Sequence, residues 1–533
     1  MKTIKNTLHK HHIHLYIGLY FILNLFTLTA FPLIHSDEAW LAGLTNDYIR
    51  HKTVFVSESF FDLMPRTVHT LKSFYHLLQI PIVQLLGNTA FSIRLLSLIA
   101  AVVALYFIYY LFISLRIHSI RALLYTIIFS LNLQFIYAGH FGRQEMILLM
   151  VLSLCLYLYY KNKSIFKMAL LLGLSIGFHP NAFIITTMIG FILLKDSLAK
   201  TISLKHLLSF IGIVGGFAAL HVAFTLLANP NFLPEYWAYG QTLHVDALPS
   251  SRLVNLKDFY LKLYYQVSGT YYIPPMQGLY ITGGFLSAGT FIYGLSKKFT
   301  HTHKLIQLLM DASLMVFAFN MSVFVIGRFN TTSITFAILP VYLLILLALE
   351  IIYSFRDRFI RSFRFHGFKY LSYVLIVFLL LTSLQALRSE YQSSHHNTYT
   401  EYLDEIQNNI DADSVILGNL SSGFIFHDHK FYDIRNLSHI NRNSKYPYDR
   451  TIEDYIKNRN IDTIIYYEEY DYIHRNQKWE ILYGDDESWY NDLQVFLREE
   501  AKLVYEFEST YYGSRIIRFL GDHPWKVYIY KLN

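Results

Sequence analysis

Apolar stretches about as long as a lipid bilayer is thick recur along most of this chain of 533 residues. A helix needs about 20 mainly apolar residues to cross the hydrocarbon core, and we count about eleven such stretches before residue 387. Hydrophobic residues make up 53% of the chain and charged residues only 16%, which fits this interpretation. We therefore expect an all-α polytopic membrane domain over residues 1–387.

Basic residues fall in short clusters between the apolar stretches, at alternate turns. The clusters are residues 2–14, 116–121, 161–167, 195–206, 297–304 and 356–369. By the positive-inside rule we expect the N-terminus in the cytoplasm and the first loop on the opposite face. The apolar stretch at residues 13–33 is long for a signal peptide and lacks a small-residue cleavage site, so we expect it to stay as the first span. The net charge of +7 then reflects topology, and nucleic acid is not an expected partner.

Two segments of the membrane domain are expected to lie outside the bilayer. Residues 36–90 contain two amphipathic helical patterns, the second around Pro81, that together resemble a lid. Residues 229–276 are rich in Tyr and Trp and poor in charge, which favours an ordered, functional loop over a disordered one.

The chain changes character after residue 387. Strand patterns at residues 413–417, 462–467 and 526–530 alternate with helical patterns, which we place at residues 399–410, 451–458 and 493–502. Such alternation predicts a small extracytoplasmic α/β domain over residues 388–533. The single cysteine, Cys155, lies in an apolar stretch, so no intramolecular disulfide can support this domain.

An acidic pair, Asp37 and Glu38, stands just after the first apolar stretch. Ser36 could cap a helix with both acids in its first turn, which stabilises a helix without any further function. A carboxylate at the outer membrane surface, beneath an amphipathic lid, is also well placed to act on a lipid head group. The sequence leaves both interpretations open.

Four short motifs resemble those of the GT-C superfamily of membrane glycosyltransferases, which includes protein O-mannosyltransferases and lipid A aminoarabinose transferases. In chain order they are Ser36-Asp37-Glu38-Ala39-Trp40, Phe91-Ser92-Ile93-Arg94-Leu95-Leu96-Ser97, Gly142-Arg143-Gln144-Glu145 and Gly177-Phe178-His179-Pro180-Asn181. Each motif alone is weak, whereas their order and spacing over residues 1–390 point to the superfamily. The resemblance implies a polyprenyl-phosphate sugar donor, an active site on the outer face of a cell membrane, and Asp37 as catalytic base. The range of the family suggests a bacterial inner membrane.

Transfer of a sugar from a lipid phosphate requires few protein groups. The phosphate is already a good leaving group, so inverting transfer needs one base for the acceptor hydroxyl and positive charge near the phosphate. Asp37 is the expected base, and Glu38 either orients it or holds a cation, which leaves dependence on a divalent cation open. The cations that we expect to bind the phosphate are Arg66, Arg94, Arg143 and Arg328.

Several of these cations have a plainer alternative role. Arg94 and Arg143 stand at the ends of apolar stretches, where snorkelling explains a charge equally well. Arg66 stands where relatives often carry Lys or His before two prolines, and we expect it to replace a phosphate-binding lysine. Arg143 and Glu145 are two residues apart and would not face each other on a helix, so each is expected to find its partner elsewhere.

The candidates for binding the sugar or the acceptor are Glu145, His179, Asn181, Glu235 and His244. His179 and Asn181 flank a proline and could equally form an ordinary tight turn. Glu235 and His244 belong to the aromatic segment, which we expect to close over the sugar because aromatic faces bury sugar C–H surfaces. The acceptor is a lipid, a glycan or a protein, and the sequence does not separate these.

Two other functions remain open at this stage. Asp311 and His221 lie within apolar stretches, where ionisable groups often mark ion routes, as in a glycolipid flippase or exporter. Asp311 is, however, close to the basic end of its stretch, where Lys304 or the end of a neighbouring helix could pair with it. The third reading is a non-catalytic glycan-assembly protein whose α/β tail binds carbohydrate.

Overall fold

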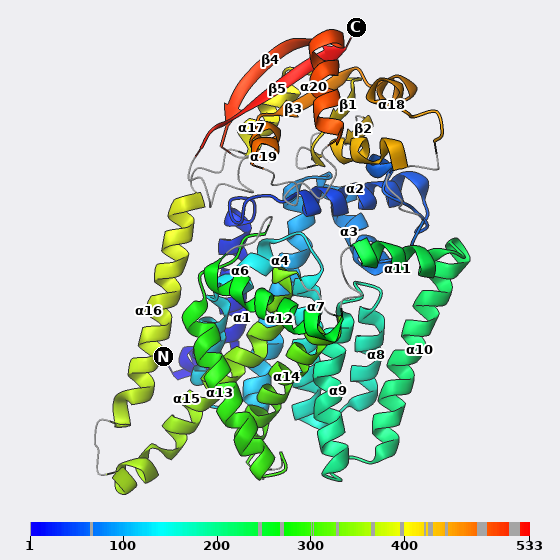
Figure 1. The fold of residues 1–533 in the computed structure, drawn as a ribbon. Helices are drawn as coiled ribbons and strands as arrows, with labels where there is room; N and C mark the ends of the chain where they lie inside the picture. The colour runs from blue at the N-terminus through cyan, green and yellow to red at the C-terminus, as the bar shows by residue number, and fades with distance from the viewer. Residues whose placement is uncertain are drawn as a thin grey trace.

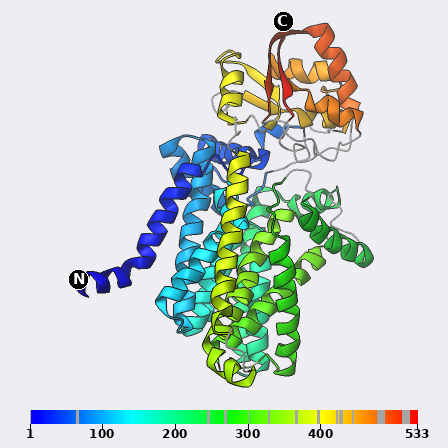
Figure 2. The same cartoon turned by 90° about the vertical axis from the view of Figure 1, so that its left-hand side faces the viewer.

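The computed structural model shows a bundle of helices with a small sheet domain stacked on one end (Figures 1 and 2). It describes residues 2–63, 68–242, 248–266, 271–299, 301, 303–326, 330–363, 368–394, 399–420, 423–424, 430–442, 446–476, 488–510 and 523–532.

The bundle contains twelve helices that run along its length or cross part of it. They are α1 (Lys2–Thr27), α4 (Ala90–Ser114), α5 (Ser119–Ser130), α6 (Leu133–His140), α7 (Glu145–Asn162), α8 (Ile165–Ser175), α9 (Ala182–Leu198), α10 (Leu204–Ala228), α13 (Gln277–Ser296), α14 (Lys304–Ile326), α15 (Thr335–Phe363) and α16 (Phe368–Ser394). Among the described residues, six helices are long and apolar enough to cross a membrane, or seven if the pair α5 and α6, bent by 68°, counts as one span. The chain is thus an integral membrane protein.

The expected number of about eleven spans is not reached by this test of length and composition. Apart from the bent pair α5 and α6, two helices of the bundle are too short for it, since α8 has 11 residues and α9 has 17. Others, such as α1 and α13, are long enough but less apolar, because polar side chains are scattered along them. An apolar stretch in the sequence therefore does not always correspond to one long straight span.

Asp311 lies inside the bundle with its charge compensated. Its carboxylate is fully buried and pairs with Nζ of Lys195 in the last turn of α9 at 2.6 Å. The Tyr160 hydroxyl of α7 donates to the same carboxylate at 2.5 Å, and Lys195 also contacts Asp196 at 2.8 Å. The end of a neighbouring helix, and not Lys304, is thus the partner, and the contacts tie α7, α9 and α14 together.

The first external segment forms two helices across the end of the bundle, as the sequence patterns predicted. These are α2 (Ser36–His51) and α3 (Ser73–Leu86), joined through the short turn η1 (Ser59–Phe61), and they lie between the bundle and the sheet (Figure 1). The amide of Phe74 donates to the carbonyl of Gly177 at 3.1 Å. Gly177 is needed here, because a Cβ atom would collide with the Phe74 ring.

The aromatic segment is largely helical in its described part. It forms α11 (Phe232–Thr242) and α12 (Pro249–Tyr265), where the sequence suggested a loop. Trp237 is 64% exposed on α11, and Tyr265 is 66% exposed at the end of α12. Only the end of the segment, at Tyr271 and Tyr272, packs against the residues around α2 and α6.

The C-terminal domain is a five-stranded sheet with short helices around it. The strands are β1 (Val415–Gly418), β2 (Lys430–Asp433), β3 (Thr463–Tyr467), β4 (Ala501–Ser509) and β5 (Trp525–Leu532), in the order β2-β1-β3-β5-β4. β1 is parallel to β2 and β3, whereas β5 is antiparallel to β3 and β4. The helical elements are α17 (Tyr399–Gln407), η4 (Ile434–Arg442), α18 (Ile452–Arg459), α19 (Glu469–Arg475) and α20 (Ser488–Glu500).

The three strands expected from the sequence are present, and the structure adds two more. The expected helix at residues 493–502 corresponds to α20, which ends at Glu500, and β4 begins at the next residue. The sequence analysis did not predict β4, because the charged residues on its exposed face continue the charged pattern of the helix before it. β2 has only four residues, which is too few for a clear alternating pattern.

Specific polar contacts join the C-terminal domain to the first external segment. Arg459 of α18 donates from Nε to Asp62 at 2.5 Å, and the Tyr455 hydroxyl donates to the same carboxylate at 3.0 Å. The side-chain amide of Asn436 donates to the carbonyl of Phe60 at 2.9 Å. Apolar residues of both parts also share one buried cluster. The domain therefore sits directly on α2 and the turn that follows it.

Candidate active site

The start of α2 is fixed by a capping box that begins at His35. Nδ1 of His35 accepts a hydrogen bond from the amide of Asp37 at 3.0 Å, and Glu38 Oε2 accepts from the amide of His35 at 2.9 Å. The sequence analysis placed the cap at Ser36, which is wrong by one residue. With His35 as the cap, Glu38 occupies the third helical position, where an acid completes the box.

Glu38 is completely buried and forms a bidentate ion pair with Arg94 of α4. Nε and Nη2 of Arg94 each donate to one carboxylate oxygen at 2.7 Å. Nη1 donates to the carbonyls of Leu28 at 2.9 Å and Pro32 at 2.8 Å, so every nitrogen of this guanidinium is engaged. Arg94 thus connects the end of α1 and the start of α2 to α4, and its side chain is fully buried.

Glu38 also holds the chain segment that leads into α7. The amide of Gly142 donates to Glu38 Oε1 at 2.8 Å. Glycine is required at this position because a Cβ atom would lie 2.5 Å from Cγ2 of Ile93 and 3.1 Å from the Glu38 carboxylate. Ser97 of α4 donates to the carbonyls of Phe141 at 2.8 Å and Arg143 at 3.1 Å, which fixes the same segment from below.

Asp37 is held by Arg143 and Tyr271, which come from distant parts of the chain. Nη1 of Arg143 and the Tyr271 hydroxyl each donate to Asp37 Oδ2 at 2.6 Å, and Nη1 also donates to the Tyr271 oxygen at 2.9 Å. The Tyr271 ring stacks on the His35 ring, with centroids 4.6 Å apart and an angle of 8°. The side chains of Asp37 and Arg143 are 12% and 10% exposed, so a narrow part of each reaches the surface.

The surrounding charges keep Asp37 ionised. Burial on its own would raise the pKa of Asp37, but the positive charge of Arg143, the hydrogen bond from the Tyr271 hydroxyl and the positive charge of Lys72 together bring this pKa below its ordinary value. Asp37 therefore carries a negative charge throughout the neutral range. While Arg143 holds it, it is also a weaker base than an ordinary aspartate.

Arg143 also pairs with Glu145, although the sequence analysis expected them to find separate partners. Nη2 of Arg143 lies 3.0 Å from Glu145 Oε1. The expectation assumed that both residues are helical, but α7 begins at Glu145 and Arg143 precedes it in an irregular turn. Glu145 also accepts a hydrogen bond from the Thr332 hydroxyl at 3.3 Å, which brings the residues before α15 to the site.

Four polar atoms beside this ion pair have no hydrogen-bond partner within the described residues. They are Nε of Arg143, Oε2 of Glu145, and the side-chain amide of Gln144 at both its oxygen and its nitrogen. Gln144 is fully buried and Arg143 is 9% exposed. Buried polar groups are normally paired, so this cluster retains hydrogen-bonding capacity for a bound molecule.

His179 and Asn181 lie in the turn between α8 and α9, beneath the start of α3. Nδ1 of His179 accepts a hydrogen bond from the amide of Asn181 at 2.9 Å, which fits the tight-turn interpretation. Burial, and then the charges of Lys72 and Arg143, hold the pKa of His179 well below its ordinary value, so its ring is neutral. The influence of both cations places this ring on the same side of the molecule as Asp37.

Of the remaining candidates from the sequence, only Glu235 lies within the described residues. Glu235 accepts a hydrogen bond from Asn229 at 2.7 Å, within its own segment. Arg66, His244 and Arg328 lie outside the described residues. Within the described residues, no group of three or more His, Cys, Asp or Glu side chains could hold a metal ion.

Sequence reasoning left out His35, Lys72, Gln144 and Tyr271 as site residues. Lys72 lies at the start of α3, with Nζ 4.9 Å from the centre of the Trp40 ring, and its charge acts on both Asp37 and His179. His35 stood next to a recognised motif and Gln144 within one, so that position was an available signal. Tyr271 had none, because it is one of 43 tyrosines and lies 234 residues from Asp37.

Two solved membrane proteins share the fold. ArnT from Cupriavidus metallidurans, in the apo state, matches with a TM-score of 0.53 at 12% sequence identity, over 87% of this chain and 95% of that one. The Archaeoglobus fulgidus oligosaccharyltransferase, in the apo form, matches with a TM-score of 0.54 at 11% identity, over 94% of this chain and 80% of that one. No protein-family model and no curated protein sequence matches the chain. The chain shares the fold of these two proteins, which agrees with the resemblance seen in its motifs.

The Glu38–Arg94 pair can be tested by a double-mutant cycle. Arg94→Met leaves a buried carboxylate without its counter-charge, which we expect to cost about 3 to 5 kcal/mol of unfolding free energy. Glu38→Gln added to Arg94→Met should recover part of that loss, because the uncompensated charge is gone. Melting of the detergent-solubilised protein, followed by tryptophan fluorescence, measures both. The exposed Arg498→Met is the matched control, and an Arg94→Met protein as stable as this control would contradict the assignment.

Proposed function

We propose that this protein transfers a sugar from a polyprenyl-phosphate donor to a lipid, glycan or protein acceptor on the outer face of the membrane, with Asp37 as the base. The observation that carries the proposal is the buried Asp37 carboxylate, ionised and paired with Arg143 at the end of a membrane bundle. A general base and a cation within one site are what transfer from a lipid phosphate requires. The GT-C fold supports the same reading.

The orientation of the bundle follows from its basic turns. The helix ends that face each other in the pairs α9 and α10, α13 and α14, and α15 and α16 lie at the end opposite to the C-terminal domain (Figure 1). Between these helix ends the sequence carries clusters of Lys and Arg. By the positive-inside rule that end faces the cytoplasm, so Asp37 and the C-terminal domain are extracytoplasmic.

The proposed reaction breaks one bond and forms one. The acceptor hydroxyl loses its proton to the Asp37 carboxylate as its oxygen attacks the anomeric carbon of the donor. The bond between that carbon and the phosphate oxygen breaks, and its electron pair leaves with the polyprenyl phosphate. Positive charge near the leaving phosphate stabilises the charge that it gains. No second carboxylate has to protonate the leaving group, in contrast to glycoside hydrolysis.

Arg143 has two tasks in this scheme, and they compete. While it pairs with Asp37 it lowers the basicity of the carboxylate. An incoming phosphate offers Arg143 a stronger anionic partner, since Arg binds phosphate oxygens through two parallel hydrogen bonds. As Arg143 turns toward the phosphate, the pKa of Asp37 rises because its counter-charge is shared. Donor binding thus makes Asp37 a stronger base for the acceptor hydroxyl.

Arg143 and Lys72 are the described cations that we assign to the phosphate. Arg66 and Arg328, outside the described residues, stay as predicted ligands. Arg94 is a positioning residue in this proposal, because its donors are engaged by Glu38 and by two carbonyls.

The groups assigned to the sugar and the acceptor are a separate part of the proposal. Glu145, paired with Arg143, can accept hydrogen bonds from sugar hydroxyls, and the neutral His179 ring, whose Nδ1 already accepts from Asn181, can donate one from Nε2. Asn181 flanks His179 in the same turn. Glu235 and His244 stay as predictions for the aromatic segment.

The flippase reading rested on Asp311 and His221, and the geometry of Asp311 gives that reading no support. The Asp311 charge is compensated by Lys195 and lies near the proposed cytoplasmic end. A residue held in this way stabilises helix packing without any role in transport.

The base assignment predicts that Asp37→Asn abolishes transfer. The substitution keeps the shape of the side chain and removes its basicity, so we expect a loss of at least about a hundredfold. The assay uses the full-length protein in proteoliposomes, labelled polyprenyl-phosphate sugars, and an envelope extract as acceptor. Asp258→Asn, an exposed position on α12, is the matched control. Equal transfer by Asp37→Asn and wild type would remove Asp37 from the mechanism.

Removing Arg143 should change the pH dependence of transfer. In the free enzyme Arg143 lowers the pKa of Asp37, whereas burial raises it, so Arg143→Gln leaves burial dominant and the pKa rises. The carboxylate is then protonated at higher pH. As the pH is lowered, kcat/KM for the donor should therefore begin to fall at a pH about 1 to 3 units higher than in wild type. An acid limb at the wild-type position would contradict this, and Arg498→Gln should leave the profile unchanged.

A further inference from the structure

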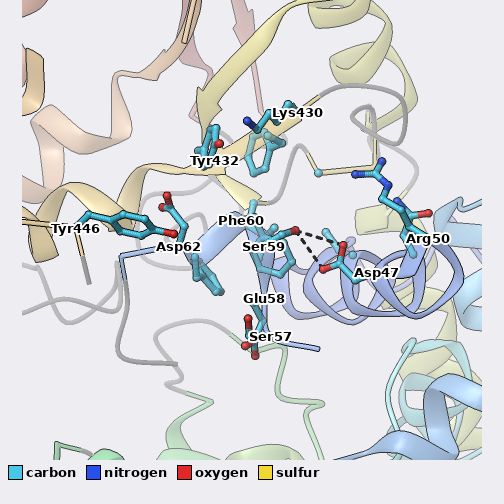
Figure 3. A pocket seen from close by; sticks show the side chains of 17 residues that line it. Asp47, Arg50, Ser57, Glu58, Ser59, Phe60, Asp62, Lys430, Tyr432 and Tyr446 are labelled. Carbon is cyan, nitrogen blue, oxygen red and sulfur yellow. Dashed lines mark hydrogen bonds between the residues drawn. The ribbon is translucent and has the colours of Figure 1, made fainter. Parts of the chain in front are cut away.

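A cavity of about 360 Å³ lies between α2, the turn after it, and strand β2 of the C-terminal domain. Figure 3 shows its walls, with Asp47 and Arg50 of α2 facing Lys430 and Tyr432 of the domain, and with Tyr446 on the far side. Its size falls in the range of small-molecule sites, about 300 to 1,000 Å³. The cavity exists only because the C-terminal domain sits on the first external segment.

The cavity follows one face of α2. Ala39, Gly43, Asn46, Asp47 and Arg50 line it, at the spacing of a single helical face. Ala39 is two residues from Asp37, so the base stands in the same turn of the helix but on a different face. The lining residues extend about 16 Å along the helix, at 1.5 Å per residue. A molecule in the cavity therefore lies on the helix that also carries the base.

Asp47 is a buried carboxylate with unused hydrogen-bonding capacity. It is 4% exposed, and within the described residues its hydrogen bonds come from one residue, Ser59, through its hydroxyl at 3.1 and 3.3 Å and through its backbone. No ion pair to it is found among those residues, and burial raises its pKa. An ionised carboxylate has about four acceptor positions, so Asp47 can take several further donors from a ligand in the cavity.

The other walls combine groups that suit a carbohydrate. Tyr432, Tyr446 and three phenylalanines supply aromatic surface, which binds the C–H faces of sugar rings. Lys430 and Arg50 are exposed at the rim, and Glu58 is buried inside. Asp62 also lines the cavity but is paired with Arg459, so Asp47 and Glu58 face two bases and neither sign of charge dominates. Such a lining favours an uncharged ligand with many hydroxyl groups over a phosphate or a polyamine.

We propose that this cavity binds an uncharged sugar unit of the acceptor, with Asp47 accepting hydrogen bonds from its hydroxyl groups. The inference rests on the proposed function and assigns the acceptor a glycan part. The donor phosphate, held by Arg143, and the acceptor glycan then occupy two ends of α2.

Binding can be measured through a cysteine placed in the cavity wall. The only natural cysteine, Cys155, is fully buried, so Ser57→Cys provides a single accessible thiol in the full-length protein. Its rate of modification by a small maleimide is measured with maltose, cellobiose or chitobiose as neutral probes, and with glucuronic acid and glucosamine as charged ones. We expect at least one neutral disaccharide to slow the reaction about threefold or more. Adding Asp47→Asn should remove that protection, and Ser250→Cys, exposed on α12, should show none.

Transfer assays on the same proteins separate this inference from the proposed function. Asp47→Asn should need about tenfold more envelope extract for half-maximal transfer, as expected for one lost charged hydrogen bond. Asp404→Asn, exposed on α17, should behave as wild type. The sugar site would be overturned if only charged probes protect the thiol, if no probe protects it, or if protection survives Asp47→Asn. In each of these cases, sugar transfer by the wild type would still uphold the proposed function. Protection without any transfer would overturn the acceptor assignment.

Discussion

The ion pair between Asp37 and Arg143 is the contact on which the rest of the site depends. It joins the first turn of α2, the irregular segment before α7, and Tyr271 from the far end of the aromatic region. Removing two charges from water is costly, and such a pair persists only where further hydrogen bonds and rigid neighbours support it. The support comes from Glu38 and Arg94, which lie directly beneath and hold the same two chain segments through bonds that leave no surface exposed. The Glu38–Arg94 pair is therefore fully buried and structural, whereas the Asp37–Arg143 pair remains accessible to a ligand.

Adjacent acids thus have different tasks, and this explains why the sequence supported two interpretations of them. The helix-cap reading and the catalytic reading of the acidic pair were treated as alternatives. In the structure Glu38 completes the capping box, whereas Asp37 faces Arg143. Local sequence patterns predicted that both acids stand at a helix start near a membrane exit, because these are local features. They could not predict that Glu38 pairs with Arg94 and Asp37 with Arg143, because these partners come from α4 and from the segment before α7.

Contacts between distant segments account for most of what the sequence did not reveal. The pairing of Arg143 with Glu145 was excluded by a helical rule that does not apply to an irregular turn. Tyr271 lies more than two hundred residues from Asp37, and no pattern in one sequence links them. The domain interface follows the same logic, since Asp62 and Arg459 come from opposite ends of the chain. The bundle, the lid helices and three of the strands were predictable because they depend on periodicity within short windows.

The central claim is that Asp37 and the donor phosphate compete for Arg143, and binding of polyprenyl phosphate tests it most directly. Affinity is measured for wild type and Asp37→Asn in detergent, without acceptor, so that no chemistry intervenes. The account predicts severalfold tighter binding by Asp37→Asn, because its neutral amide no longer holds the guanidinium, and weak binding by Arg143→Gln whether or not Asp37 is also replaced. Equal or weaker binding by Asp37→Asn would show that the two anions do not share Arg143, and would contradict the account.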